Sequence, residues 1–354
     1  MIRFYWEVLE YRLAFIIPLM IFTFSGCAQP KKYDVALVGF YNLENLFDTI
    51  NQPNVQDDEF TPGSAKRYTS KVYNDKLKKL SRVISEMGSD GSPDGLAILG
   101  VAEVENRSVL EDLVKTPKLV SRNYQIVHVD GPDERGIDVG LIYNPSYFEA
   151  DKIISLHVPA ETLDIIKGHT RDILLVSGEL MGEKLHVFVN HWPSRWGGEE
   201  VSRPYRKLAA TVCKHAVDSL MFINTEAKIL VLGDFNDDPV DESVSVILNA
   251  KEEKDKVRTG DLYNPGIALF KKGEGSLCYK GKWNLFDQIM VSSALLNEEQ
   301  TGFFFKDAEI FKEDYMITKT GKFQGYPRRS YSRDTYIWGY SDHLPVYIIL
   351  LREF

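Results

Sequence analysis

Apolar runs of strand length that end in polar residues are the feature that most constrains how this chain folds. Near the C-terminus, Ser341-Asp342-His343-Leu344-Pro345 leads directly into the apolar run Val346–Leu350. Three further apolar runs end in polar groups, at Glu103, at Asn190-His191 and at Asp234-Phe235-Asn236. Charged or polar side chains at the mouth of a buried strand cost free energy unless they satisfy each other or do chemistry. The pattern therefore predicts a β-rich fold in which strand ends bring carboxylates, amides and imidazoles together.

The other periodic segments predict the fold class. Strands are expected at 35–41, 96–101, 124–129, 139–143, 173–177, 185–189, 229–232, 288–291 and 346–351. Helical spacing of apolar residues predicts helices at 70–87 and from about 204 to 222, with the lysines of the first facing solvent. Because strands outnumber helices, we expect an α+β fold: a four-layer α/β/β/α sandwich of two mixed β-sheets flanked by helices.

Composition limits what the chain can do without a metal. The 354 residues are 44% hydrophobic and 26% charged, which are ordinary globular values. The net charge of −9 gives no overall positive field, so any phosphate or nucleic-acid site must be a local basic patch or must use a metal ion. Residues 33–354 show no convincing internal boundary and are expected to form one domain.

The N-terminus predicts export from the cytoplasm. Residues 13–24 form an apolar run that is short for a membrane span and typical of the core of a secretory signal. Small residues ahead of Cys27 resemble the bacterial lipoprotein box, so residues 1–32 are interpreted as a leader and tether, with Cys27 as the lipidation site. A retained membrane anchor is the alternative. The remaining cysteines, Cys213 and Cys278, leave one disulfide open and no cysteine-based metal site.

Two residues at strand ends suggest a divalent-metal site. Glu103 follows the strand at 96–101, where a carboxylate would suit Mg²⁺ or Mn²⁺. Asn42, at the end of the first strand, could place an amide oxygen near the same ion. Either residue alone is more often an ordinary strand-end acid or a turn residue, and Glu105 competes with Glu103.

The segment Gly233-Asp234-Phe235-Asn236 gives the stronger catalytic signal. Asp234 and Asn236 are two residues apart, so in extended backbone they point the same way. An acid that orients water beside an amide that donates to a phosphate oxygen is what phosphodiester hydrolysis requires. A hairpin turn is the structural alternative.

Two histidines complete the expected set. His191 could donate a hydrogen bond to a phosphate and Arg195 could meet a second phosphate oxygen, although a rim histidine with a solvated arginine is the simpler alternative. Asp287, at the start of the strand at 288–291, is the natural candidate to hold the far ring nitrogen of His343. Together these residues indicate a metal-assisted hydrolase.

In this order, the motifs resemble the endonuclease/exonuclease/phosphatase superfamily. That superfamily includes pancreatic deoxyribonuclease, exonuclease III-type repair nucleases, inositol polyphosphate 5-phosphatases and bacterial sphingomyelinases. The similarity spans essentially the whole mature chain. Within the superfamily, the chain most resembles the secreted bacterial branch. It rests on Asn42, Val101–Asn106, Arg135–Tyr143, the His191 segment, Gly233–Asn236, Tyr279–Asn284, Phe286-Asp287-Gln288 and Ser341–Pro345.

The resemblance implies a role for each matched residue. Glu103 would be the main metal ligand, with Asn42 and Asp342 nearby. Asp234 and Asn236 would position the attacking water and the phosphate. His343, held by Asp287, and His191, partnered by Asp138, would contact the phosphoryl oxygens. Ala102 stands where many members carry Gln, which leaves one contact behind the metal ligand in doubt.

The sequence leaves three functions open. The first is an extracytoplasmic endonuclease, monomeric and tethered to a membrane surface, with Arg135, Asp138, Arg195, Lys280 and Trp283 binding nucleic acid and Mg²⁺ as cofactor. The second is a phosphatase or sphingomyelinase-like phospholipase acting on phosphorylated lipid or sugar head groups. A lipid-contacting hairpin would favour it, and Thr301–Phe305 is the one candidate, although it is equally good core. The third is a non-catalytic surface binding protein.

Overall fold

The computed structural model describes residues 32–163, 168–298 and 301–354. Within it, Tyr33–Phe354 form one compact unit. The expected leader and Cys27 lie outside the described residues. None of the helices in the described part is both long enough and apolar enough to span a membrane.

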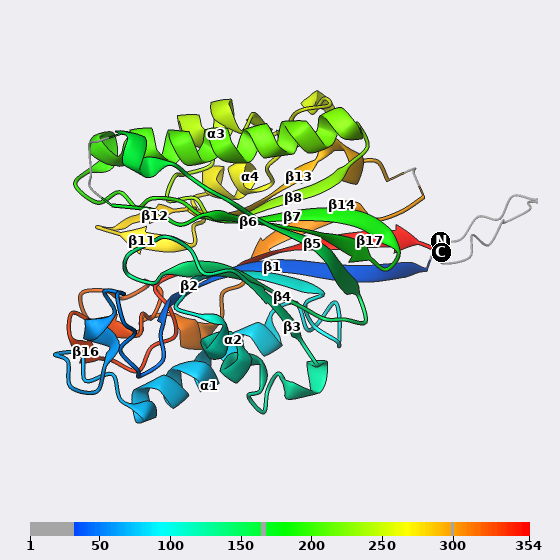
Figure 1. Cartoon of the computed structure of the whole chain (residues 1–354). Helices are drawn as coiled ribbons and strands as arrows, with labels where there is room; N and C mark the ends of the chain where they lie inside the picture. Colours follow the sequence, from blue (N-terminus) through cyan, green and yellow to red (C-terminus); the bar gives the residue numbers. More distant parts are fainter. Residues whose placement is uncertain (1–31, 164–167, 299–300) are drawn as a thin grey trace, which may run out of the picture. The chain divides into compact units, whose positions relative to one another are not determined.

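Two β-sheets form the centre of this unit, and the α+β prediction is confirmed (Figure 1). The first sheet runs, from edge to edge, β14 (Phe304–Ile310), β17 (Val346–Glu353), β1 (Tyr33–Leu46), β2 (Ile98–Val104), β4 (Asp138–Tyr143) and β3 (Gln125–His128). The second runs β5 (Phe148–Leu156), β6 (Ile173–Leu180), β7 (Glu183–His191), β8 (Lys228–Asp234), β13 (Asp287–Ser292), β10 (Leu262–Tyr263) and β9 (Ala250–Lys251). Both sheets are mixed, because β1–β2, β7–β8 and β9–β10 are parallel pairs while the other pairs are antiparallel.

Helices cover the outer faces of the two sheets (Figure 1). They are α1 (Ser70–Glu86) and α2 (Arg107–Val114) on the first sheet, and α3 (Glu199–Ile223) and α4 (Gly266–Lys271) on the second. Two small hairpins complete the unit, β11 (Leu277–Tyr279) with β12 (Lys282–Asn284), and β15 (Tyr331–Ser332) with β16 (Thr335–Tyr336). Short helical turns lie at Asp58–Phe60, Val120–Arg122, Ala160–Leu163, Ser243–Ile247, Lys254–Lys256, Ser293–Leu295 and Asp314–Met316.

Alternation along the strands sorts the side chains into three cores. On β1, Val38 and Phe40 face the second sheet and pack with residues such as Leu232, while Leu37 and Tyr41 face the α1 side. The outer face of the second sheet packs against α3 through residues such as Cys213. Burying a side chain of this size contributes about 1.5–3 kcal/mol, so the register of each strand is strongly specified.

Most expected elements are present with altered ends. The nine expected strands and the helix at 70–87 are confirmed. The second helix begins at Glu199 rather than near Pro204, because acidic residues occupy its first turn and Ser202 Oγ donates to the Gly198 carbonyl oxygen at 2.8 Å. The strands β5 and β14 and helix α2 were not predicted. The Cys213–Cys278 disulfide that the sequence left open is not formed.

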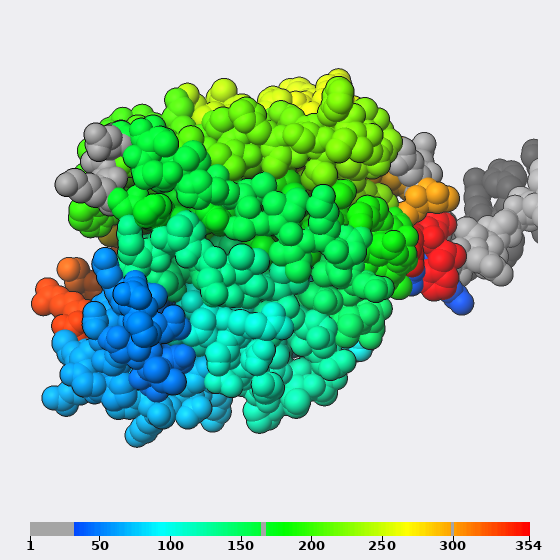
Figure 2. Space-filling view, viewed as in Figure 1, coloured from blue at the N-terminus to red at the C-terminus, as the bar shows by residue number. Residues whose placement is uncertain are grey.

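Two distant segments meet at the end of the unit where β1 and β2 finish. In the space-filling view the segment around 50–68 and part of 311–340 lie side by side (Figure 2). The Tyr331 hydroxyl donates to the Lys66 carbonyl oxygen at 3.3 Å, and the rings of Tyr68 and Tyr331 stack with centroids 6.3 Å apart. These two segments therefore pack against each other beside the strand ends.

Candidate active site

Bulges in β1 and β2 aim the first carboxylate. Glu44, Asn45 and Glu103 all have positive φ, and the β1–β2 and β2–β4 registers shift at these positions. The backbone N–H of Asn45 donates to Glu103 Oε2 at 2.9 Å. Positive φ is unfavourable for residues other than glycine, and strain of this kind gathers at functional sites. The two bulges thus hold Glu103 in one orientation.

Three neighbouring strands of the second sheet, β7, β8 and β13, carry polar residues that lie side by side at the same end of the sheet. On β8, Asp234 lies opposite His191 of β7 on one side and Asp287 of β13 on the other. The close approach of β7 to β8 needs a glycine, because a Cβ on Gly233 would lie 2.3 Å from the carbonyl oxygen of Asn190. Strand register alone therefore juxtaposes one imidazole and two carboxylates.

His343 is oriented by Asp287, as the sequence suggested. Its Nδ1 lies 2.6 Å from Asp287 Oδ2, and its Nε2 lies 3.8 Å from Asp234 Oδ2. The His343 backbone N–H donates to Ser341 Oγ at 3.1 Å, which fixes the loop. Asp287 is fully buried, so this contact forms without competition from water.

The two histidines are held in opposite charge states. Burial by itself would lower the pKa of His343, but the carboxylates of Asp287 and Asp234 raise that pKa well above its ordinary value. Burial lowers the pKa of His191 well below its ordinary value, and the positive charges of Arg171 and Arg135 lower it further. At neutral pH one imidazole is therefore cationic and the other neutral.

Burial also perturbs Asp234. It raises the pKa of this carboxyl to about 7; the negative charges of Asp287 and Glu103 act in the same direction, and His343 offsets part of the effect. A carboxyl that titrates near neutral pH can accept a proton during a reaction. Perturbed groups gathered in this way are typical of catalytic sites.

Glu103, His191 and Asp234 are spaced to hold a cation. Each offers one ligand atom, and these atoms lie within 4.8 Å of one another. The Asn42 Nδ2 group donates to Glu103 Oε1 at 3.1 Å and to Asp234 Oδ2 at 3.0 Å, bringing the two carboxylates together. Two converging carboxylates fit a hard ion such as Mg²⁺. Asp234, Asp287 and His343 satisfy the same spacing, but His343 and Asp287 already satisfy each other.

Several expected residues have other partners. The amide oxygen of Asn42 accepts from the Glu44 N–H at 2.9 Å, so the side chain faces the carboxylates as a donor and not as the oxygen ligand that was expected. Asp342 lies 3.2 Å from Arg329 and belongs to none of the metal-capable groups of the described residues. Asn236 Nδ2 donates to the Trp192 carbonyl oxygen at 3.0 Å.

The prediction that Asp138 is the partner of His191 is wrong. Asp138 Oδ2 lies 3.3 Å from Nε2 of His128, on the neighbouring strand β3, and its Oδ1 accepts from the Gly131 N–H at 2.9 Å. Within the described residues, His191 Nδ1 is buried without a hydrogen-bond partner. His128 is the nearer imidazole because β3 and β4 are paired directly.

The expected phosphate contact of Arg195 is also corrected. Its guanidinium donates to the Asn236 carbonyl oxygen at 2.9 Å and is tied to the carboxylates of Asp237, Asp241 and Glu199. These interactions use its donors for anchoring. Arg195 is therefore a structural residue behind Asn236.

The other three expected substrate residues differ in their exposure and in their protein partners. Arg135 makes a bidentate pair with Asp133, at 3.1 and 3.0 Å, but remains about half exposed. Trp283 packs against the α1-side core, with Lys312 Nζ 4.9 Å from its ring centroid. Lys280 lies on the exposed β11–β12 hairpin, 5.1 Å from the ring centroid of Tyr279.

Two buried cations were missed from the sequence. Arg171 donates to the carbonyl oxygens of His191, at 3.2 Å, and Trp192, at 2.7 Å, and so fixes the end of β7. No sequence signal distinguished it from other loop arginines. Lys76 was expected to face solvent, yet it is buried and donates to the Glu44 carbonyl oxygen at 2.6 Å. Its spacing of four residues from Val72 and Leu80, on the apolar face of α1, was an available signal.

Two cavities adjoin these residues. One, of about 870 Å³, is lined by Asn236 and by both the loop after β7 and the β11–β12 hairpin. The other, of about 450 Å³, is lined by Arg135 and Arg171 among others. Trp196 and Ser194 line both cavities. The loop at 193–198 therefore borders both cavities.

Comparisons with known proteins agree with this geometry. A model of the endonuclease/exonuclease/phosphatase family matches residues 37–352. A comparison with curated proteins found no match. Among solved structures, the chain is similar to an endonuclease/exonuclease/phosphatase family protein from Bacteroides thetaiotaomicron, with 14% identity, a TM-score of 0.51, and coverage of 91% of this chain and 100% of that one.

Two further similar structures have more specific names. One is the mannosyl-6-phosphatase Bt3783 of B. thetaiotaomicron, with 16% identity, a TM-score of 0.52, and coverage of 89% and 99%. The other is D. rerio TDP2 complexed with a single-strand DNA product, with 13% identity, a TM-score of 0.51, and coverage of 89% and 98%. Similarity at this level of identity establishes the shared fold.

Proposed function

Because the chain belongs to the endonuclease/exonuclease/phosphatase family, whose members hydrolyse phosphoester bonds, we propose that it is a Mg²⁺-dependent phosphodiesterase that cleaves nucleic acid outside the cytoplasm. The observation that carries the chemistry is the convergence of Glu103 and Asp234 beside the His343–Asp287 pair. Four side chains far apart in the sequence face one another there. A binding protein without catalysis would gain nothing from this costly arrangement.

The residues divide the work of an in-line hydrolysis. Asp234, which lies between His191 and Asp287 at the strand ends, takes the proton of the attacking water as the water oxygen bonds to phosphorus. The ester bond to the leaving oxygen then breaks, and that oxygen takes up a proton from solvent. The cationic His343, fixed by Asp287, stabilises the charge that develops on the phosphoryl oxygens. Mg²⁺, which Glu103 and Asp234 would hold, supplies further stabilisation of that charge when bound.

Support for a nucleic-acid substrate comes from the cavity beside Asn236. Its lining combines exposed aromatic rings with Lys280 and Lys282, a combination that suits bases and phosphates. The phospholipase alternative loses its one candidate for lipid contact, because Phe303, Phe304 and Phe305 are buried. A sugar phosphatase would use the same chemistry and remains the competing function, since one similar structure is a mannosyl-6-phosphatase.

The proposed location follows from the N-terminus alone. A leader ending at Cys27 would tether a monomeric enzyme to the outer face of a membrane through a lipid. Metabolic labelling with a fatty-acid analogue tests this: label lost in Cys27→Ser supports the anchor, and label retained in that variant contradicts it.

A substrate panel tests the activity. Residues 33–354 are incubated with Mg²⁺ and plasmid DNA, RNA, mannose 6-phosphate or sphingomyelin. We expect nicking of plasmid DNA or cleavage of RNA that EDTA abolishes and that Asp234→Ala lacks. Release of inorganic phosphate from the sugar ester without nucleic-acid cleavage would instead establish the phosphatase.

A further inference from the structure

Trp196 is a large aromatic side chain that the structure leaves in contact with solvent. The side chain is 72% exposed, on the loop between His191 and helix α3, and it lines both cavities beside the site. A tryptophan offers one of the largest apolar surfaces for burial, so leaving it in water forgoes stability. Exposed aromatic residues around a cleft indicate a binding surface.

The loop that carries Trp196 is held in place on both sides. Arg195, the preceding residue, is bonded to the Asn236 carbonyl oxygen and to three carboxylates. On the other side, the Gly198 N–H donates to the Arg195 carbonyl oxygen at 3.1 Å and closes the turn, with Gly197 and Gly198 at φ of 76° and 112°, values that glycine adopts without strain. Trp196 is thus presented on an anchored turn, which lowers the entropy lost on binding a ligand.

A second exposed ring lines the larger cavity. Tyr279 is 61% exposed on the β11–β12 hairpin, with Lys280 Nζ 5.1 Å from its ring centroid and Lys282 on the same hairpin. Both lysines line the cavity, together with Trp196 and Asn236. Two π-faces and two ammonium groups next to a catalytic residue match a chain of alternating bases and phosphates.

We propose that Trp196 and Tyr279 form a base-stacking subsite that selects single-stranded nucleic acid and holds it across the scissile phosphate. The inference rests on the proposed nuclease function. A duplex hides its base faces in its own stack, whereas a single strand offers them to side chains. Because Trp196 lines both cavities, a strand stacked on this ring can continue from one cavity into the other.

Paired substrates isolate the contribution of the bases. A 20-nucleotide strand of thymidines and a strand of the same length built from abasic tetrahydrofuran units carry the same phosphates, but only the first can stack. kcat and KM are measured on both for the wild type, Trp196→Ala, Tyr279→Ala and Trp196→Phe. Phe222→Ala, which removes an exposed ring at the end of α3, is the matched control. Melting temperatures verify that each variant is folded.

We expect Trp196→Ala to raise KM on the thymidine strand by roughly 5- to 100-fold, the range for loss of one base–aromatic stack. On the abasic strand it should change little, Trp196→Phe should restore most of the affinity, and Phe222→Ala should behave as wild type. Binding of labelled strands is also measured by fluorescence anisotropy with variants that carry Asp234→Ala. The Trp196 and Tyr279 substitutions should lower the affinity in the same order in which they raise KM.

Three results would overturn the subsite. If the wild type cleaves both strands with equal KM, the proposed nuclease function stands and the proposed base stacking is contradicted. An equal loss on both strands in Trp196→Ala assigns the residue to loop structure. Cleavage of neither strand, with turnover of a sugar phosphate, removes the proposed function and the subsite together.

Discussion

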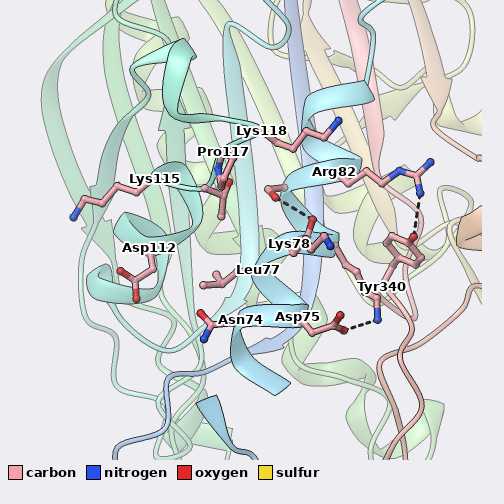
Figure 3. A pocket seen from close by; sticks show the side chains of 13 residues that line it. Asn74, Asp75, Leu77, Lys78, Arg82, Asp112, Lys115, Pro117, Lys118 and Tyr340 are labelled. Atoms are coloured by element: carbon pink, nitrogen blue, oxygen red, sulfur yellow. Dashed lines mark hydrogen bonds and ion pairs between the residues drawn. The ribbon is translucent and has the colours of Figure 1, made fainter. Parts of the chain in front are cut away.

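Two cavities of similar size illustrate what marks a functional site in this protein. One lies between α1, the end of α2 with the turn at 115–118, and Tyr340, and has a volume of about 780 Å³ (Figure 3). The other lies beside Asn236 and has a volume of about 870 Å³. Their volumes do not distinguish them, and both are lined by charged residues.

The difference is in how the charges are satisfied. Around the first cavity the side chains pair along the helix surface, as in Lys79 with Asp75, and Arg82 reaches the Tyr340 hydroxyl at 3.5 Å (Figure 3). At the strand ends that precede Asn236, where Asp287 and His191 flank Asp234, Asp287 Oδ1 and His191 Nδ1 are buried without a hydrogen-bond partner in the described part of the chain. Paired charges near the surface have their partners and need no further explanation, whereas buried unsatisfied groups are costly and need a reason. Two such atoms beside the converging carboxylates, and not the cavity volume, point to the site.

The strongest test of this contrast removes one carboxylate from each region. Asp234→Ala is expected to lower kcat by at least about 100-fold, because it removes both a proton acceptor and a metal ligand. Asp112→Ala, which removes an exposed carboxylate from the lining of the α1 cavity, should leave kcat unchanged. Steady-state assays on any cleaved phosphodiester provide the comparison. Near-normal turnover in folded Asp234→Ala would exclude that residue from the mechanism.

Magnesium should stabilise the protein through the site and not through the α1 cavity. Binding at a concentration 100 times Kd adds about 2.7 kcal/mol to the free energy of unfolding. We expect Mg²⁺ to raise the Tm of the wild type and of Asp112→Ala, but not that of Glu103→Gln. Scanning fluorimetry with and without EDTA measures this. An unchanged metal response in Glu103→Gln would place the ion elsewhere.

Asp287 should matter through His343. Asp287→Asn is expected to lower kcat by about 10- to 100-fold, because the imidazole loses the carboxylate that orients and charges it. In a His343→Ala background the same substitution should add little, since the two residues act as a unit. Independent, multiplicative losses would contradict the pairing. Asp75→Asn, at an acid paired on the surface of α1, is the control.

The smallest expected effect is a change in the free energy of unfolding, and it is measured by comparing two lysines of α1. Lys76→Met should lower the free energy of unfolding by about 1–3 kcal/mol, because the buried Glu44 carbonyl oxygen loses its donor. Lys78→Met, at an exposed position lining the α1 cavity, should change it by less than about 0.5 kcal/mol. Urea denaturation measures both values. Equal effects would show that burial of Lys76 carries no energetic weight.

Strand periodicity was enough to predict most of the fold. The central strands are long apolar runs, so their positions follow from local sequence, and their polar ends identified Glu103, Asp234, Asp287 and His343. The strands β5 and β14 were missed for a physical reason. They lie at sheet edges, where alternate residues face solvent and the apolar signal is weak.

The partners of polar residues were less predictable. Asp138 pairs with His128 because β3 neighbours β4, and that pairing depends on tertiary register. Arg195 is anchored by acids that follow Asn236, which spacing alone did not reveal. Residue type predicted which groups do chemistry, whereas packing decided which of them are free to reach a substrate.

Locating a manganese ion tests the central claim most directly. Crystals soaked in Mn²⁺ and measured at the manganese absorption edge should show an anomalous peak within roughly 2.0–2.6 Å of carboxylate oxygens of Glu103 and Asp234. The account predicts that this peak disappears in Glu103→Gln. His128, Asp130 and Asp138 form a third group of the described residues whose ligand atoms lie within 4.8 Å of one another. A peak there, with none beside Asp234, would contradict the account.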